Sequence, residues 1–233
     1  MLRSNLTRLG LAGGLILLAA CSAADQVTSP KYNKMPRPAG APSLDVIVNA
    51  VAPDSASADF TVTPSGGTFV LGAHAVYFPA NSICDPAVSS YGPGEWDAPC
   101  TPLDRPIDIH AEMRRTADGQ SWLDFTPSLR FVPTDDPNGV VWVLLKLNND
   151  ATEQNYRSRS IRWAPNFLDS STQVEESLQD STLKSYIDLQ RDIVFRRIKH
   201  FSGYVAGDGF DTPAGDPGGL TAGTVDPLID IVW

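Results

Sequence analysis

The sequence predicts an all-β protein, folded as an antiparallel β-sandwich. Its 233 residues include 19 prolines and 18 glycines, which favour turns over long helices. Short runs of β-branched and aromatic residues alternate with turn signals about every eight to twelve positions. The hydrophobic content of 42% is enough to build one domain with a core.

The first half of the chain contains most of the expected strands. They lie at residues 44–51, 60–63, 67–71, 75–78, 107–113, 121–125 and 129–132. Pro79 ends the fourth of these, because proline has no N–H for a sheet hydrogen bond. The segment 107–113 alternates, so Ile107, Ile109 and Ala111 are expected to face the core.

The second half of the chain contains the predicted central strand of one sheet. Residues 140–147 are apolar on both faces, which predicts a central strand and two packed sheets. Residues 156–163 alternate and suggest a half-buried strand, whereas residues 172–183 fit either a loop or one helical turn. Residues 186–189 and 193–206 are expected to form the last hairpin.

The two ends of the chain differ from the region between them. Residues 22–43 are rich in Ala, Ser and Pro, which predicts a flexible tether, and residues 207–226 are dominated by Gly, Asp, Pro, Ala and Thr, which predicts a disordered or loosely draped tail. The apolar residues 228–233 could add an edge strand to the domain.

The first 21 residues carry an export pattern. Arg3 and Arg8 are followed by an apolar run that ends in Leu18-Ala19-Ala20-Cys21, and this run is too short to span a bilayer. The segment resembles a bacterial lipoprotein signal peptide, and the alternative is an ordinary secretory signal with a chance cysteine. The resemblance implies that Cys21 becomes an acylated N-terminus, which anchors the protein to a membrane.

The expected organisation follows from these segments. It consists of a signal peptide (1–20), a lipidated tether (21–43), a β-sandwich domain (44–206) and a tail (207–233). The expected location is the cell envelope. By analogy with lipoprotein sorting, Ser22 after the lipidated cysteine permits transfer to the outer membrane if the source has two membranes.

The remaining cysteines, Cys84 and Cys100, are predicted to form a disulfide, because an exported protein meets an oxidising compartment. The bridge would close a loop rich in Gly, Pro and Ser that cannot build its own core. Two cysteines without a nearby histidine pair do not complete a zinc site, and no metal or other cofactor is expected.

The charge of the chain argues against nucleic acid as a partner. The formal net charge of -9 becomes -11 when Arg3 and Arg8 leave with the signal peptide, and residues 191–199 interleave their basic side chains with apolar ones as a strand would.

Residues 66–71 (GGTFVL) and 75–83 (AVYFPANSI) combine a double glycine, a strand, a short turn and a second strand that ends in an apolar-Pro-small motif. They resemble the opening of the ZU domain of zonula occludens proteins, netrin receptors, ankyrins and the death-domain protein PIDD. Residues 199–204 (KHFSGY) resemble this domain faintly near its end. The resemblance covers roughly residues 43–206 and implies a β-sandwich fold. Residues 84–100 depart from the family, so the strand order around them is left open.

The tripeptide His200-Phe201-Ser202 is the segment that could carry chemistry. It is similar to the site at which PIDD and a self-cleaving nucleoporin break between Phe and Ser, which implies attack of the Ser202 hydroxyl on the Phe201 carbonyl with His200 as base. Such a step also needs donors for the developing oxyanion. The alternative, which the sequence favours, places Phe201 in the core and His200 and Ser202 on the surface.

Other candidate site residues are weaker. His74 is expected in a solvated turn and His110 on a solvated strand face. Tyr91 and Trp96, within the loop closed by the disulfide, could present an aromatic surface to a ligand such as a carbohydrate.

These patterns together favour a lipid-anchored protein-interaction or structural module that is not an enzyme, with an unidentified protein or glycan partner. The sequence contains no G-x-S-x-G, H-E-x-x-H or phosphate-loop pattern. A self-cleaving module and a surface carbohydrate-binding module are the two alternatives.

Overall fold

The computed structural model describes residues 38–47, 53–147 and 159–207, and the backbone of residues 229–232. The predicted signal peptide, Cys21, most of the tether and most of the tail lie outside the described residues.

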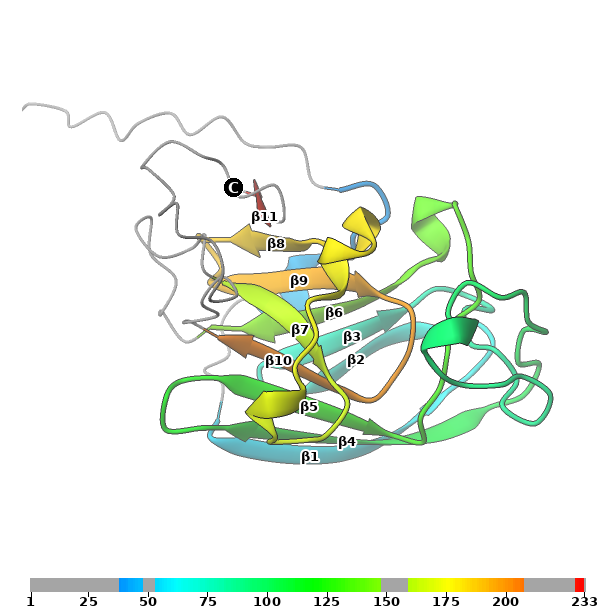
Figure 1. The fold of residues 1–233 in the computed structure, drawn as a ribbon, viewed down its shortest axis with the longest axis horizontal. Coiled ribbons are helices and arrows are strands. Elements are labelled where there is room, and N and C mark those ends of the chain that lie inside the picture. The colour runs from blue at the N-terminus through cyan, green and yellow to red at the C-terminus, as the bar shows by residue number, and fades with distance from the viewer. Residues whose placement is uncertain (1–37, 48–52, 148–158, 208–228, 233) are drawn as a thin grey trace, which may run out of the picture. The chain divides into compact units, whose positions relative to one another are not determined.

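The strands form two sheets (Figure 1). The first sheet has the order β1 (Ser55–Val62), β4 (Ile107–Arg115), β5 (Ser121–Thr126), β10 (Gly203–Gly207) and β7 (Ser160–Ala164). The second has the order β11 (Ile229–Val232), β8 (Ser185–Asp188), β9 (Ile193–Ile198), β6 (Val141–Lys146), β3 (His74–Phe78) and β2 (Gly67–Leu71). Neighbouring strands are antiparallel, except that β11 runs parallel to β8 at the edge.

The predicted all-β sandwich is therefore confirmed. Helical structure in the described residues is limited to short 3-10 turns: η1 (Leu44–Ile47), η2 (Pro93–Glu95), η3 (Pro137–Gly139), η5 (Ser170–Thr172), η6 (Glu176–Leu178) and η7 (Ser181–Leu183). The C-terminal edge strand expected within residues 228–233 is present as β11.

Three strand predictions need correction. The segment predicted as a strand from residue 44 begins with η1, because Ser43 Oγ accepts the Asp45 N–H and turns the chain locally. Residues 129–132 make only isolated bridges, such as the one between Arg130 and His200. The continuous strand predicted over 193–206 is interrupted at residues 199–202.

That interruption moves the chain from one sheet to the other, since β9 belongs to the second sheet and β10 to the first. Gly203 permits the entry into β10, because a Cβ there would lie 2.3 Å from the carbonyl oxygen of Ala164 on β7. We call residues 199–202 the crossover segment.

A cluster of aromatic rings occupies the core between the sheets. Phe78 of β3 lies edge-on to Phe131 and Phe201, with ring centroids 6.0 and 5.4 Å away, and Phe201 stacks on Phe125 of β5 at 4.1 Å. These rings come from both sheets and from the segments between strands, so they join the two layers.

The outer face of the second sheet is also covered. Trp142 and Leu144 of β6 pack there with Phe195 of β9, Tyr186 of β8 and Leu44 of η1. Strand β6 is consequently buried on both faces, as its continuous apolar sequence predicts.

Replacing Phe78 tests the aromatic core. Phe78→Ala should lower the free energy of unfolding by about 3–5 kcal/mol, because a ring that is 1% exposed leaves a cavity. Urea denaturation followed by tryptophan fluorescence measures the change. The control Val70→Ala removes a side chain that is 47% exposed on the same hairpin and should cost less than about 0.5 kcal/mol. Equal losses in the two variants would contradict this account of the core.

Candidate functional site

The crossover segment is held by backbone hydrogen bonds to residues 129–131. The Phe131 N–H donates to the Lys199 carbonyl at 2.8 Å, and the Phe201 N–H donates to the Leu129 carbonyl at 2.6 Å. Because these bonds flank His200, its backbone has a fixed position at the end of the sandwich. The Phe201 ring points into the core, as predicted, and is fully buried.

His200 is also fully buried, so the prediction that it lies on the surface is wrong. Its Nε2 lies 2.9 Å from Glu176 Oε1, and the other oxygen of Glu176 accepts a hydrogen bond from Arg196 Nη2 at 2.7 Å. Arg196 Nη1 donates to the Ile161 carbonyl at 2.6 Å. The buried imidazole thus has a polar partner, and the buried carboxylate has a cationic one.

The charge on Glu176 determines where the proton of His200 sits. Burial alone would raise the pKa of Glu176, but the hydrogen bond from His200 and the charge and hydrogen bonds of Arg196 hold that pKa below its usual value. An ionised carboxylate only accepts, so Nε2 of His200 must donate, and in the neutral ring Nδ1 carries the lone pair. Among the described residues, Nδ1 is buried without a hydrogen-bond partner.

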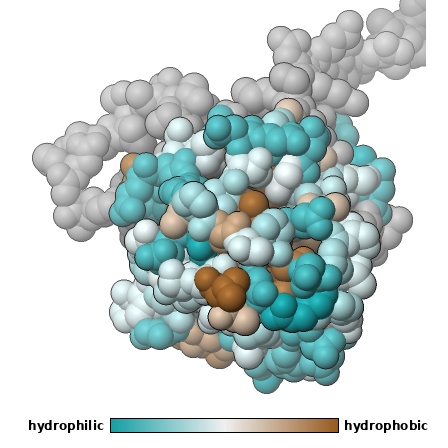
Figure 2. Space-filling model, turned by 90° about the vertical axis from the view of Figure 1, so that its right-hand side faces the viewer, coloured by the Kyte–Doolittle hydropathy of each residue, from teal (hydrophilic) through white to brown (hydrophobic). Residues whose placement is uncertain are grey.

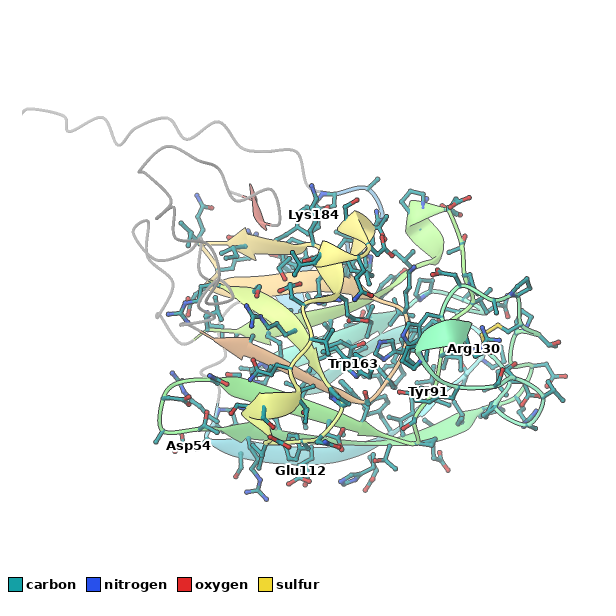
Figure 3. The ribbon with its side chains drawn as sticks, viewed as in Figure 1. Asp54, Tyr91, Glu112, Arg130, Trp163 and Lys184 are labelled. Atoms are coloured by element: carbon teal, nitrogen blue, oxygen red, sulfur yellow. A yellow bond between two sulfur atoms is a disulfide. The ribbon has the colours of Figure 1, made fainter. Side chains whose placement is uncertain are left out.

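The bond between Phe201 and Ser202 has polar contacts at both ends. The Tyr91 hydroxyl donates to the Phe201 carbonyl oxygen, and the indole Nε1 of Trp163 donates to Ser202 Oγ at 2.7 Å. Burial is the main cause of a raised pKa for Tyr91, so the phenol keeps its proton near neutral pH. Figure 3 places Tyr91, Arg130 and Trp163 toward the same end of the sandwich.

Trp96 lies against the same segment. Its ring stacks on the His200 imidazole with centroids 4.0 Å apart and an interplanar angle of 19°. Trp96 is only 8% exposed, so the expected open aromatic surface is not formed by this ring, whereas Tyr91 is 41% exposed and packs edge-on to Trp96 at 4.8 Å.

The predicted disulfide between Cys84 and Cys100 is present, with Cα atoms 5.7 Å apart. It closes the loop 85–99, which carries both Tyr91 and Trp96. Arg130 binds the C-terminal part of this loop, because its guanidinium donates hydrogen bonds to the carbonyl oxygens of Glu95 and Ala98.

A groove with a volume of about 570 Å³ opens beside the crossover segment. Trp96 and Lys199 contribute to its wall, and Lys199 Nζ forms ion pairs with Asp97 and Asp180. Figure 2 looks onto this end of the molecule and shows a surface of mostly hydrophilic side chains with isolated hydrophobic ones. Water therefore has access to the edge of the segment.

The other histidines lie elsewhere. His74, expected in solvent, is completely buried. Its Nδ1 accepts the Lys146 N–H at 3.1 Å, and burial followed by the charge of Arg115 lowers its pKa to about 3. His110 is half-exposed, as expected, and its Nδ1 lies 2.7 Å from Asp59. Within the described part of the chain, no group of three or more potential metal ligands is found.

Glu176 and Trp163 carried no signal in the sequence, because they lie 24 and 39 positions from the groups they contact. Tyr91 and Trp96 were predicted as ligand contacts, but their contacts to the tripeptide were not, since Tyr91 lies 110 positions from Phe201. The tripeptide, the two cysteines and the aromatic residues of the loop between them could be found without the fold.

Comparisons with protein-family models, with curated proteins and with solved structures found no match to this chain. Among the residues that the structure describes, no helix is long and apolar enough to cross a membrane.

Replacing Glu176 tests the buried pair through pH. Because the folded pKa of Glu176 lies below its unfolded value of about 4.5, its stabilising effect is present above that pH and is lost as the pH falls through the folded pKa. Glu176→Gln should therefore reduce the acid dependence of the free energy of unfolding, measured by urea denaturation between pH 3 and pH 7.

The variant should also lose about 3–5 kcal/mol at pH 7, because Arg196 is left buried without its counter-charge. Glu112→Gln on β4 is the control, since the side chain of Glu112 is 36% exposed. An unchanged pH profile in Glu176→Gln would mean that this carboxylate does not contribute to acid unfolding.

Proposed function

We propose that this protein is a lipid-anchored module of a bacterial cell envelope that acts through interaction with other molecules and matures by breaking its own Phe201–Ser202 bond. The observation that supports self-cleavage is the hydrogen bond from the Tyr91 hydroxyl to the Phe201 carbonyl oxygen. It supplies the oxyanion donor that a self-cleavage site needs and that the tripeptide alone cannot provide.

The anchor and the fold class are supported separately. The pattern Leu18-Ala19-Ala20-Cys21 supports lipidation at Cys21, and the disulfide is consistent with an oxidising compartment. The two-sheet architecture is compatible with the resemblance of residues 66–83 to the ZU domain. The membrane is thus one partner of the protein, and its outer-membrane location rests on Ser22.

The cleavage step begins at Ser202. His200 Nδ1 takes the hydroxyl proton while Oγ attacks the carbonyl carbon of Phe201. Negative charge develops on the Phe201 oxygen, where the Tyr91 hydroxyl donates. The carbon–nitrogen bond then breaks, the nitrogen of Ser202 receives the proton from His200, and an ester joins Phe201 to Ser202 Oγ.

Water completes the reaction. Hydrolysis of the ester leaves a carboxylate on Phe201 and restores the hydroxyl of Ser202, whose amino group is now free. The groove beside Trp96 and Lys199 gives water a route to the segment. Glu176 accepts the hydrogen bond from Nε2 and so orients the His200 ring for this step.

The two pieces would stay together after cleavage. Strand β10 starts directly after Ser202 and lies between β5 and β7 in the first sheet, with hydrogen bonds to both. The cut therefore leaves the sandwich intact as an interaction module. A carbohydrate surface built on Trp96 is not part of the proposal, because His200 covers one face of that ring.

Lipidation is tested on the protein purified from its membrane fraction. Mass spectrometry should find an N-terminal peptide that begins at Cys21 and carries acyl chains. Cys21→Ala should move the protein to the soluble fraction, because the anchor is lost, whereas the control Ser22→Ala should stay in the membrane. An N-terminus upstream of Cys21, or a Cys21 without acyl chains, would contradict the anchor.

Self-cleavage is tested by denaturing electrophoresis and intact mass. Two pieces, ending at Phe201 and beginning at Ser202, should separate under denaturing conditions and co-elute on a native column. Ser202→Ala should abolish them, and Ser202→Cys should retain them because a nucleophile remains. Tyr91→Phe should slow their appearance roughly 100-fold, since it removes one oxyanion donor.

Tyr77→Phe removes a hydroxyl on β3 and should cleave like the wild-type protein. A single uncut chain after prolonged incubation would overturn the self-cleavage proposal and leave the lipid-anchored interaction module standing. A wild-type rate in Tyr91→Phe would remove the observation that carries the mechanism.

A further inference from the structure

We propose that the disulfide-closed loop 85–99 is the part that completes the cleavage site, so that the chain cuts itself fast only after Cys84 and Cys100 have been oxidised. This inference rests on the proposed self-cleavage and adds its regulation. It follows from how the loop contacts the crossover segment and how the loop itself is held.

The loop supplies two contacts to the tripeptide. Tyr91 donates its hydroxyl hydrogen to the Phe201 carbonyl oxygen, and the Trp96 ring covers one face of His200 at 4.0 Å. Trp163 of β7 packs edge-on to His200 and donates a hydrogen bond to Ser202, but Ser202 Oγ is the attacking atom and not the oxyanion. The side chain that donates to the Phe201 oxygen therefore belongs to the loop.

The loop has little packing of its own to keep Tyr91 in place. Its regular structure is limited to the short turn η2, and Val88 at its outer end is 71% exposed. Of the large hydrophobic side chains in the loop, Trp96 is buried, whereas Tyr91 and Val88 are exposed. A loop with so few apolar contacts opens easily unless its ends are fixed.

Three sets of interactions fix the two ends of the loop. The disulfide joins Cys84 to Cys100, and the Asp85 carboxylate, next to the first cysteine, receives two hydrogen bonds from Arg105. At the other end, Arg130 donates to the carbonyl oxygens of Glu95 and Ala98.

Arg130 also connects the loop to the site. Its backbone is paired with His200 in an isolated bridge, and its side chain is 5% exposed beneath the loop. Arg130 thus lies between the two residues whose backbone hydrogen bonds hold the crossover segment, and its own side chain binds the loop carbonyls. Figure 3 shows Arg130 and Tyr91 on this side of the molecule, near the disulfide.

The disulfide determines how often the loop is closed. A crosslink removes open conformations from the ensemble, and a loop with cysteines separated by 16 positions is long enough for that effect to matter. The cleavage rate scales with the fraction of molecules in which Tyr91 reaches Phe201. Reduced chains should therefore cleave slowly, and exported, oxidised chains should cleave fast.

The experiment compares cleavage rates of the full-length protein in two redox states. Uncut protein is prepared under reducing conditions, oxidised glutathione is added, and disulfide formation and the two pieces are followed by intact mass over time. Cleavage should begin with the disulfide. The double variant Cys84→Ser/Cys100→Ser should cleave roughly 100-fold more slowly than the oxidised protein, as expected for loss of one oxyanion donor.

A double-mutant cycle tests whether the disulfide acts by positioning Tyr91 or by stabilising the protein in general. If it acts through Tyr91, then Tyr91→Phe should slow cleavage strongly in the oxidised protein but slow it little further in the Cys84→Ser/Cys100→Ser background. Additive effects would overturn the inference, because the bond would then act through other groups. Val88→Ala is the matched loop control and should leave the rate unchanged.

The outcomes distinguish the inference from the proposal beneath it. If the oxidised wild-type protein never cleaves, both the inference and the proposed self-cleavage are overturned. A protein that cleaves equally fast with and without the disulfide overturns the inference and keeps the proposed function.

Thermal unfolding checks that the cysteine variant folds. If it does not, Arg130→Met is used with the disulfide intact, because it releases the loop carbonyls. It should also cleave more slowly, and a wild-type rate in that folded variant would count against the inference.

Discussion

A buried carboxylate connects three separate parts of this chain. Glu176 on η6 binds Arg196 of β9 and His200 of the crossover segment, and all three residues are at most 8% exposed. Arg196 also donates to the Ile161 carbonyl on β7. The contact therefore reaches both sheets at the point where the chain passes between them, and the positions of Phe201 and Ser202 depend on it.

The segment that carries Glu176 consists of short turns. Because buried polar groups need hydrogen-bond partners, the free N–H groups of residues 169–183 are bound by acidic side chains that cap these turns. Asp169, Glu175 and Asp180 each accept an N–H two residues further on. These caps explain why the segment shows neither strand nor helix periodicity in the sequence, yet has a defined conformation that presents Glu176 inward.

Local pattern predicted the sheets and failed at the crossover. The hairpin 67–78 and the central strand 141–146 follow from continuous or alternating apolar residues. The strand expected over 193–206 is broken because β9 belongs to the second sheet and β10 to the first, so the chain must pass between the layers at residues 199–202, which a local pattern does not reveal. Glu176, Tyr91 and Trp163 are brought to the tripeptide by the fold alone. The sequence could identify the tripeptide, the disulfide and the aromatic residues of the loop, but not the contacts between them.

The composition of the buried cluster argues for a role beyond packing. Replacing a buried ion pair by apolar side chains of similar size is often neutral or stabilising, so stability alone does not require Glu176, Arg196 and His200 in the interior. Departures from good core packing are expected at functional sites. Here the departure places His200, oriented by Glu176, one residue before a carbonyl group that accepts a phenolic hydrogen bond. An apolar core would hold the sheets together equally well, but it would not supply the oriented imidazole that the proposed cleavage requires.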